Sequence, residues 1–438
     1  MFRNLIAILV LPAAAGAQQL AGTTDTTLHP ISVQEAVRLA QENNVSAIVA
    51  SNNVRNANTG VLTAKGAFLP SLTGTLGQTQ SGGQQVSPNG TLVPYAAAPW
   101  RYSTGLRASM TLFDGGQRLA TLRQQRANVN AQEAGQTATK FNLAFQVKQA
   151  YNSVLAAKES EAAAQAQLHL ANQQLATTNA KVNAGAASIS DSLRSVVGVG
   201  NAQLAILTAR NNLKVASASL TRLVGTPYFV TAEYSDTTER TVAPIDSAAV
   251  MALALAGPQV RQTQAQLAAD EAAQRSAKSA YFPNIDLSYS YSGNGYDKYY
   301  GIGNGQLGYS HSLGLSASLP IFNGFTREAN VQRAQVTVEN DQATLRDQQL
   351  AAQQAVVTDI GSLELAAESM RIQELNVAAD EEDLRVVQQR YALGASTLLE
   401  VLTSQSNLVT ARQQLIQARL NYRNARAQIE SVIGRDLP

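Results

Sequence analysis

The sequence has 438 residues but no cysteine, only one tryptophan and only three histidines, and each shortage excludes a class of site. Without cysteine the chain has no disulfide, no thiolate metal site, no cysteine nucleophile and no N-terminal lipid anchor attached to cysteine. His29, His169 and His311 are widely separated, which leaves little basis for a histidine metal site or general base. The 33 basic and 31 acidic residues nearly cancel, which argues against nucleic acid as a partner. We therefore expect no enzyme activity, no cofactor and no metal.

The N-terminus has the features of a secretory signal peptide over residues 1–17. Arg3 supplies a positive charge, residues 5–11 form an apolar segment, and residues 15–17 are a small-residue cleavage site. We expect the mature chain to begin at Gln18. No later stretch approaches the 18 or more apolar residues of a membrane-spanning helix. A soluble secreted protein and an outer-membrane β-protein are both consistent with that pattern.

The rest of the chain is a tandem duplication with an offset near 209 residues. Four pairs of segments align at offsets of 209 or, for the first pair, 213: 65–72 with 278–285, 111–118 with 319–327 (where Phe113 and Phe322 are 209 apart), 181–193 with 390–402, and 209–214 with 418–423. The sequence therefore predicts a first repeat at 18–225, a linker at 226–244, a second repeat at 245–434 and a C-terminal tail at 435–438.

In each repeat, a segment of alternating apolar and small polar residues predicts a pair of β-strands. Leu106, Ala108 and Met110 alternate with Arg107 and Ser109, and the same period recurs at 285–291, at 312–319 and, more weakly, after Pro70. Strands of about 8–12 residues are long enough to cross an outer membrane when tilted, although a soluble β-sandwich gives the same alternation. The segments 82–100 and 293–308 are predicted to be long outer loops. Arg107 and Asp286 fall on the polar face, so we expect both in a water-filled lumen.

Helical patterns flank these strands. Residues 31–66 read as one helix that begins with a capping box formed by Ser32 and Glu35. Residues 117–182 and 326–393 contain no proline and one glycine each. A helix of that length spans about 100 Å, which a compact domain rarely accommodates. Short turns reverse the chain into return helices of about 35–40 residues; these turns are Ala184-Gly185-Ala186 and Leu393-Gly394-Ala395.

The return helices carry apolar residues seven positions apart, which indicates coiled-coil packing. The heptad positions are Val199, Ile206, Leu213 and Leu220 in the first repeat, and Leu408, Leu415, Tyr422 and Ile429 in the second. Arg210 and Arg419 occupy equivalent positions, and we interpret both as contacts between helices. Four strands cannot close a membrane barrel, whereas three chains supply enough strands for a pore.

Together, these motifs resemble the TolC-like outer-membrane efflux proteins over nearly the whole mature chain. The motifs are AFLP and AYFP before the strands, FDGG and FNGF before the long helices, YALGASTLLEVL at the second turn, ARNNL and ARLNY, and the terminal VG and IG. The resemblance implies a mainly α fold with membrane β-structure: a homotrimer whose four strands per chain complete a 12-stranded β-barrel above a periplasmic α-barrel. Residues 226–244 would join an equatorial belt. It further implies a passive exit duct for tripartite efflux or type I secretion, partnered by a periplasmic adaptor and an inner-membrane pump.

The resemblance also assigns roles at the helical turns. Tyr391 matches a tyrosine that holds the closed tip by hydrogen bonding, and Glu400 matches an acidic residue that forms a constriction ring; Asp191 is its first-repeat equivalent. The six turn residues 184–186 and 393–395 are expected to dock the adaptor. This chain departs from the family at Ser396, where an arginine is common, and at Thr403, where a second acid is common. A simpler interpretation is that the two acids cap helices and that the glycines only permit tight turns.

Two other functional classes remain open from the sequence. A soluble periplasmic adaptor also contains a helical hairpin, but usually only one, with flanking lipoyl-like motifs that this chain lacks. An enzyme such as a cell-wall hydrolase would need a nucleophile–base pair or a phosphate loop, and the sequence shows neither pattern. The Gly-Asn-Gly segments at 293–295 and 303–305 lack the strand-to-helix context of a phosphate loop.

Overall fold

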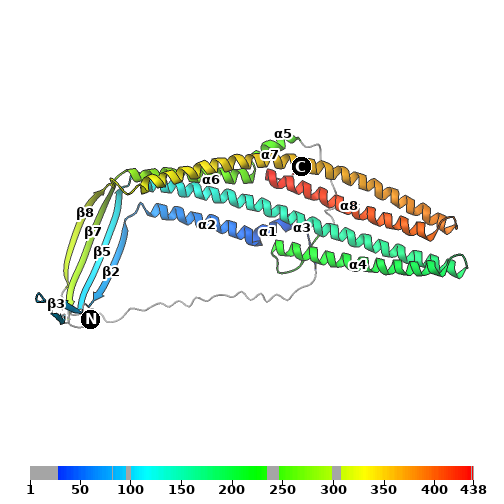
Figure 1. Ribbon diagram of the computed structural model, residues 1–438, viewed down its shortest axis with the longest axis horizontal. Helices are drawn as coiled ribbons and strands as arrows, with labels where there is room; N and C mark the ends of the chain where they lie inside the picture. The colour runs from blue at the N-terminus through cyan, green and yellow to red at the C-terminus, as the bar shows by residue number, and fades with distance from the viewer. Residues whose placement is uncertain are drawn as a thin grey trace.

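The computed structural model describes residues 28–80, 82–94, 100–233, 246–297, 307–435 and residue 437. The predicted signal peptide, most of the predicted linker and the segment 303–305 lie outside these ranges. The molecule is elongated, with a β-sheet at one end and two helical turns at the other (Figure 1). Among the described residues, no helix combines the length and apolar character that crossing a bilayer requires.

The sheet has four antiparallel strands in the order β2-β5-β7-β8. They are β2 Ser71–Thr79, β5 Trp100–Phe113, β7 Asn284–Asp297 and β8 Gly308–Ser318. Both 14-residue strands, β5 and β7, exceed the predicted length because the ladder continues into the segments predicted as loops. The first of those segments also contains a small hairpin of β3 Gln84–Val86 and β4 Leu92–Pro94.

The strand register gives the sheet two different faces. Arg107 lies opposite Thr73 on one side and Ser290 on the other, and Thr111 lies opposite Asp286. Thr111 Oγ1 donates a hydrogen bond to Asp286 Oδ1 at 2.7 Å. Because alternate residues point to opposite faces, both predicted lumen charges share the face of small polar residues.

Four long helices form two antiparallel hairpins. They are α3 Gln117–Asn183 and α4 Ile189–Val224 in the first repeat, and α7 Thr326–Ala392 and α8 Leu398–Ile433 in the second. Both long helices have 67 residues and both return helices have 36, close to the predicted bounds. Equal lengths in the two repeats follow from the constant sequence offset.

The predicted helix over 31–66 is two helices, α1 Val33–Asn43 and α2 Val45–Gly66. Asn44 breaks it because its extended backbone lets the side chain cap α2 through the Ser46 N–H, while its Nδ2 donates to the Leu223 carbonyl at 2.8 Å. Ser32 caps α1 by accepting from the Glu35 N–H at 3.2 Å. The Glu35 carboxylate forms an ion pair with Arg38, so only half of the predicted capping box is formed.

Shorter helices continue the return helices end to end. Gly225 ends α4 beside Asn43, so α1 and α2 extend the α4 column along α3 (Figure 1). In the second repeat, Gly434 ends α8 beside Pro258, where α6 Pro258–Lys278 begins; α5 Ser247–Leu255 precedes it, and a 3-10 turn, η2 Ser279–Tyr281, follows it. Each repeat is therefore two helical columns.

A small belt packs against the middle of α3. Strand β1 His29–Ile31 pairs in parallel with β6 Val230–Ala232, which falls inside the predicted linker. The buried Tyr151 donates from its hydroxyl to the Ile31 carbonyl at 3.1 Å. Lys158 donates to the Ala232 carbonyl, and burial lowers the pKa of its amine.

Polar pairs connect the two repeats where α3 crosses α8. Lys148 contacts Glu430 at 2.7 Å, Arg423 contacts Glu159 at 3.1 Å, and Asn152 donates to Asn424. Arg423 and Glu159 are both nearly buried, so loss of one partner leaves a charge with a large desolvation cost. Within each hairpin, Arg210 pairs with Glu161 and Arg419 pairs with Glu374, which are helix–helix contacts of the predicted kind.

Candidate functional site

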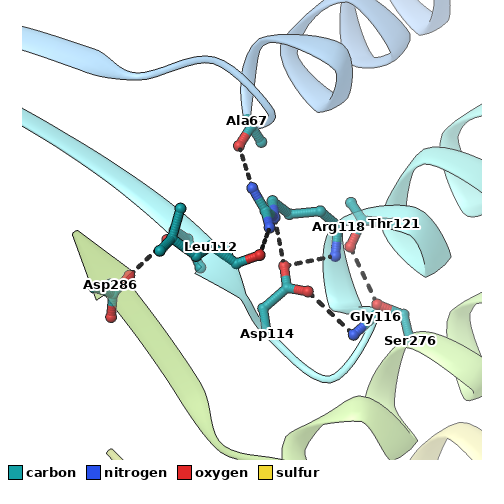
Figure 2. Close-up of polar contacts among 9 residues, drawn as sticks. Ala67, Leu112, Asp114, Gly116, Arg118, Thr121, Ser276 and Asp286 are labelled. Carbon is teal, nitrogen blue, oxygen red and sulfur yellow. Dashed lines mark hydrogen bonds and ion pairs between the residues drawn. The ribbon is translucent and has the colours of Figure 1, made fainter. Parts of the chain in front are cut away.

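The first part of the site is the joint where the sheet meets the long helices (Figure 2). The buried Asp114 accepts hydrogen bonds from Gly116 N at 3.1 Å, from Arg118 N at 3.0 Å and from Arg118 Nε at 2.8 Å. Arg118 also donates to the Ala67 and Leu112 carbonyls. One ion pair thus fixes the end of β5, the start of α3 and the segment that follows α2.

The second repeat builds the same joint with different side chains. Asn323 replaces Asp114, and Arg327 instead pairs with Glu328 at 2.8 Å while stacking 4.2 Å from the Tyr281 ring centroid. Phe325 occupies the position of Gly116 and has a φ of 62°, a left-handed conformation that costs a non-glycine residue roughly 1–2 kcal/mol. Its ring contacts Phe322 edge to face at 5.3 Å.

The second part of the site is the pair of turns at the opposite end of the molecule. Both turns have the same hydrogen-bond pattern, in which Ala186 N donates to the Lys181 carbonyl and Ala395 N donates to the Arg390 carbonyl, each at 2.8 Å. Gly185 and Gly394 have φ angles of 72° and 78°, which favour glycine. All six residues predicted to dock a partner are exposed: Ala184, Gly185, Ala186, Leu393, Gly394 and Ala395.

Tyr391 lies at this tip but is a buried residue. It packs with Leu384, Leu398 and Val401 in a cluster between α7 and α8. Among the described residues of one chain, its hydroxyl has no hydrogen-bond partner. Lys181, in the last turn of α3, instead places its ammonium 3.9 Å from the Tyr391 ring centroid and donates to the Tyr391 carbonyl. This contact joins the first hairpin to the second.

Sequence reasoning did not identify Lys181 as part of the site. A signal was present, because Lys181 and Arg390 are equivalent at the offset of 209 and each stands just before its turn. The carbonyl that Lys181 contacts depends on how the two hairpins pack, and no local pattern encodes that packing.

Glu400 and Asp191 both cap return helices. Asp191 completes a capping box with Ser188, accepting from its hydroxyl at 2.8 Å and from its N–H at 3.2 Å. Glu400 accepts from the Ser396 and Thr397 hydroxyls, while Thr397 caps the Glu400 N–H. The hydrogen bond from Ser396 lowers the pKa of the exposed Glu400 carboxyl. Ser396 therefore has a defined partner at the position where the family pattern has an arginine.

The predicted site residues thus form two groups at opposite ends of the chain. Arg107 and Asp286 lie on the sheet, whereas the turn residues, Tyr391, Glu400 and Asp191 lie at the tip. Within the ranges that the structure describes, no group of three or more histidine or acidic side chains is arranged to hold a metal ion.

Comparison with known proteins gives a consistent result. The family described as "Outer membrane efflux protein" matches residues 36–226 and, a second time, residues 251–435. Outer membrane protein TolC of Escherichia coli K12 is 26% identical over 346 residues, which cover 76% of this chain and 69% of TolC. Outer membrane efflux protein BepC of Brucella suis is 24% identical over 409 residues, covering 92% of this chain and 86% of BepC. A crystal structure of CusC shares the fold, with a TM-score of 0.75, 20% identity and 94% of each chain covered.

Proposed function

The chain belongs to the family of outer membrane efflux proteins, and on that premise we propose that three copies form a closed channel that is the passive exit duct of a tripartite efflux or type I secretion system. The observation that carries the proposal is the sheet. It has one apolar and one small polar face, and both its edge strands, β2 and β8, lack a partner among the described residues of one chain. Unpaired edges are not tolerated in lipid, so further copies must close the sheet.

The helical part supports the same assembly. The apolar side chains left exposed on α4 and α7 are suited to packing against further helices; they include Leu204, Leu207 and Val215 on α4 and Leu350, Val357 and Leu365 on α7. These two helices lie at opposite sides of the chain (Figure 1). A head-to-tail contact between them closes a ring when the rotation fits.

In this proposal, residues 18–225 and 245–434 are the two repeats, residues 226–244 lie in an equatorial belt, and residues 435–438 form the tail. The signal peptide 1–17 directs export, and the sheet anchors the chain in the membrane. Arg107 and Asp286 line the lumen, because an arginine facing lipid near the bilayer midplane costs about 2–4 kcal/mol and an aspartate there is also unfavourable.

The tip is proposed to be both the gate and the docking site. A periplasmic adaptor binds the six exposed turn residues and links the duct to an inner-membrane pump that supplies the energy. Tyr391 stabilises the closed tip through the packing of its ring. Glu400 and, to a lesser degree, Asp191 supply the negative charge that attracts cations to the entrance.

Fractionation and mass measurement test this proposal directly. Detergent extraction of the outer-membrane fraction should yield a particle with the mass of three chains, and that particle should form ion-conducting pores in planar bilayers. A soluble monomer in the periplasm would instead support the adaptor alternative and would reject the channel.

A further inference from the structure

The duplication supplies a template for the contact between neighbouring copies. Within one chain, the first repeat packs against the second along a seam formed by β5 with β7 and by α3 with α6. In a closed ring, the second repeat of one copy packs in the same way against the first repeat of the next. Since the sequence offsets are known, each contact of the internal seam can be translated into a contact between copies.

The strand pairing shows that the offsets hold at single-residue precision. In the first repeat, β2 pairs with β5 in a register that puts Ser71 opposite Ser109. In the second repeat, β7 pairs with β8 in a register that puts Asn284 opposite Ser318. These residues are related by the same offsets of 213 and 209 that align the sequences. The two strand pairs are therefore equivalent residue by residue.

From this equivalence we propose that β8 of one copy pairs with β2 of the next in the register that puts Ser318 opposite Thr75. The template is the pair Ser109 and Ser288, which lie opposite each other between β5 and β7. The proposal rests on the trimer proposed above and adds the residues that meet at its subunit interface.

The faces of the sheet agree with this register. Ser318 and Thr75 both belong to the small polar face, and the neighbouring pair, Ala317 with Leu76, belongs to the apolar face. A shift by one residue would put apolar side chains on the polar face, so odd shifts are excluded. The two most exposed large apolar side chains of the sheet lie on its edge strands: Leu76 is 74% exposed and Leu313 is 73% exposed, against 46% for Leu106 on β5.

The joint where the sheet meets the long helices leaves a space in the second repeat that a side chain of the next copy can fill. At Gly115, an added methyl group would lie 2.3 Å from Phe282 Cβ, so the internal seam is tightly filled there. At the equivalent Gly324, no atom of the described residues lies within 4 Å of the same position, apart from its own chain neighbours. Leu69, the equivalent of Phe282, is 69% exposed. In the proposed interface, Leu69 of the next copy fills the space beside Gly324.

The helices extend the interface toward the tip. Thr121 on α3 and Ser276 on α6 share a hydrogen bond at 3.2 Å between their hydroxyls (Figure 2). Their equivalents are Asn330 on α7 and Thr63 on α2, both exposed in the single chain. In the proposed interface these two side chains hydrogen-bond between copies.

Engineered cysteines test the register without background, because the chain contains no cysteine. Within one chain, Thr75 on β2 lines up across the four strands with Ser310 on β8. Ser318 is eight residues further along β8, on the order of 27 Å from Ser310 along the strand. A disulfide needs Cα atoms about 4.4–6.8 Å apart, so one between positions 75 and 318 can form only between chains.

The experiment combines S318C in turn with T73C, T75C, G77C and T79C in the full-length protein, followed by oxidation and non-reducing electrophoresis. We expect the covalent product to be strongest with T75C and to stop at three linked chains. The pair N330C with T63C should give the same product independently of the strands. The pair S109C with S288C, opposite each other within one chain, is the positive control and should form an internal disulfide.

The outcomes separate this proposal from the proposed channel. A particle with the mass of three chains in which crosslinking peaks at position 73, 77 or 79 overturns the register and leaves the trimer intact. The same particle with no crosslink at any seam pair, although S109C and S288C react, also overturns the register. A particle with the mass of one chain rejects the proposed trimer itself.

Discussion

The contact of Lys181 with Tyr391 should hold the tip closed, and its loss should open the channel. Lys181 lies in the last turn of α3, and Tyr391 lies in the last turn of α7. The ammonium stacks on the ring at 3.9 Å from its centroid and also donates to the main-chain carbonyl of Tyr391. Replacing Lys181 by methionine keeps the apolar stem and removes both interactions.

The expected effect follows from the strength of these two interactions. A cation over an aromatic ring contributes about 0.5–2 kcal/mol. A hydrogen bond from a charged donor contributes about 1.5–3 kcal/mol when well shielded. Lys181 is only partly buried, so we take about 2 kcal/mol for the two together. That energy corresponds to about a 30-fold shift of the equilibrium between the closed and open tip for each contact of Lys181 with Tyr391.

Bilayer recordings of the purified channel measure this shift as the fraction of time spent in the high-conductance state. K181M should raise that fraction strongly, and K181R should restore much of the closed state because arginine keeps the charge. Lys214, an exposed lysine on α4, provides the matched control, and K214M should behave like the parent protein.

A substitution at Tyr391 separates the ring from the hydroxyl. Because the hydroxyl has no hydrogen-bond partner among the described residues of one chain, Y391F should leave gating nearly unchanged. The reasoning is refuted if intact K181M trimers open no more often than the parent protein. A Y391F channel that opens as readily as K181M would show that the hydroxyl, rather than the ring and the carbonyl, closes the tip.

Three further predictions address charge and backbone conformation. E400Q should weaken block by multivalent cations in bilayer recordings, since it removes negative charge at the proposed entrance; unchanged block would contradict that role. Burial and the neighbouring Asp270 raise the pKa of Asp341 to about 6 from its ordinary value of 3.8. The protonated form of Asp341 is therefore favoured in the folded state, and the protein loses stability as the pH rises from about 4 through 6. D341N should raise the melting temperature at pH 7 but change it little at pH 4. An equal change at both pH values would count against this role of Asp341. G394A should destabilise the protein by about 1–2 kcal/mol, because φ is 78° at that position. G198A lies inside α4 with open space around the added methyl group, so it should stabilise the protein by roughly 0.5–1 kcal/mol. Thermal melts that rank these two variants the other way would refute the argument.

The helical hairpins and the four strands were predictable because their signals are local and occur twice. Proline-free segments rich in helix formers gave the long helices to within a few residues, and the period of two gave the strands. The break at Asn44 has one local cause, the cap that its side chain forms with the Ser46 N–H, and one that no local pattern encodes, the hydrogen bond to the carbonyl of Leu223, 179 residues away in the sequence. The half-formed capping box has a local cause: the Glu35 carboxylate accepts hydrogen bonds from Arg38, three residues further along the same helix.

At the tip, the family pattern predicts which residue types occur, whereas the hydrogen bonds of this chain determine the charge that they carry. The pattern predicts an acid at position 400 and an arginine at position 396, and the chain has glutamate and serine there. The structure shows that Ser396 and Thr397 hold the Glu400 carboxylate at the start of α8, and these hydrogen bonds lower its pKa. In a trimer, three such carboxylates facing one another would raise their pKa values. Since the local bonds act in the opposite direction, they favour a ring that keeps its charge, and therefore its attraction for cations, at neutral pH. An arginine at position 396 would neutralise part of that charge, whereas a serine stabilises it.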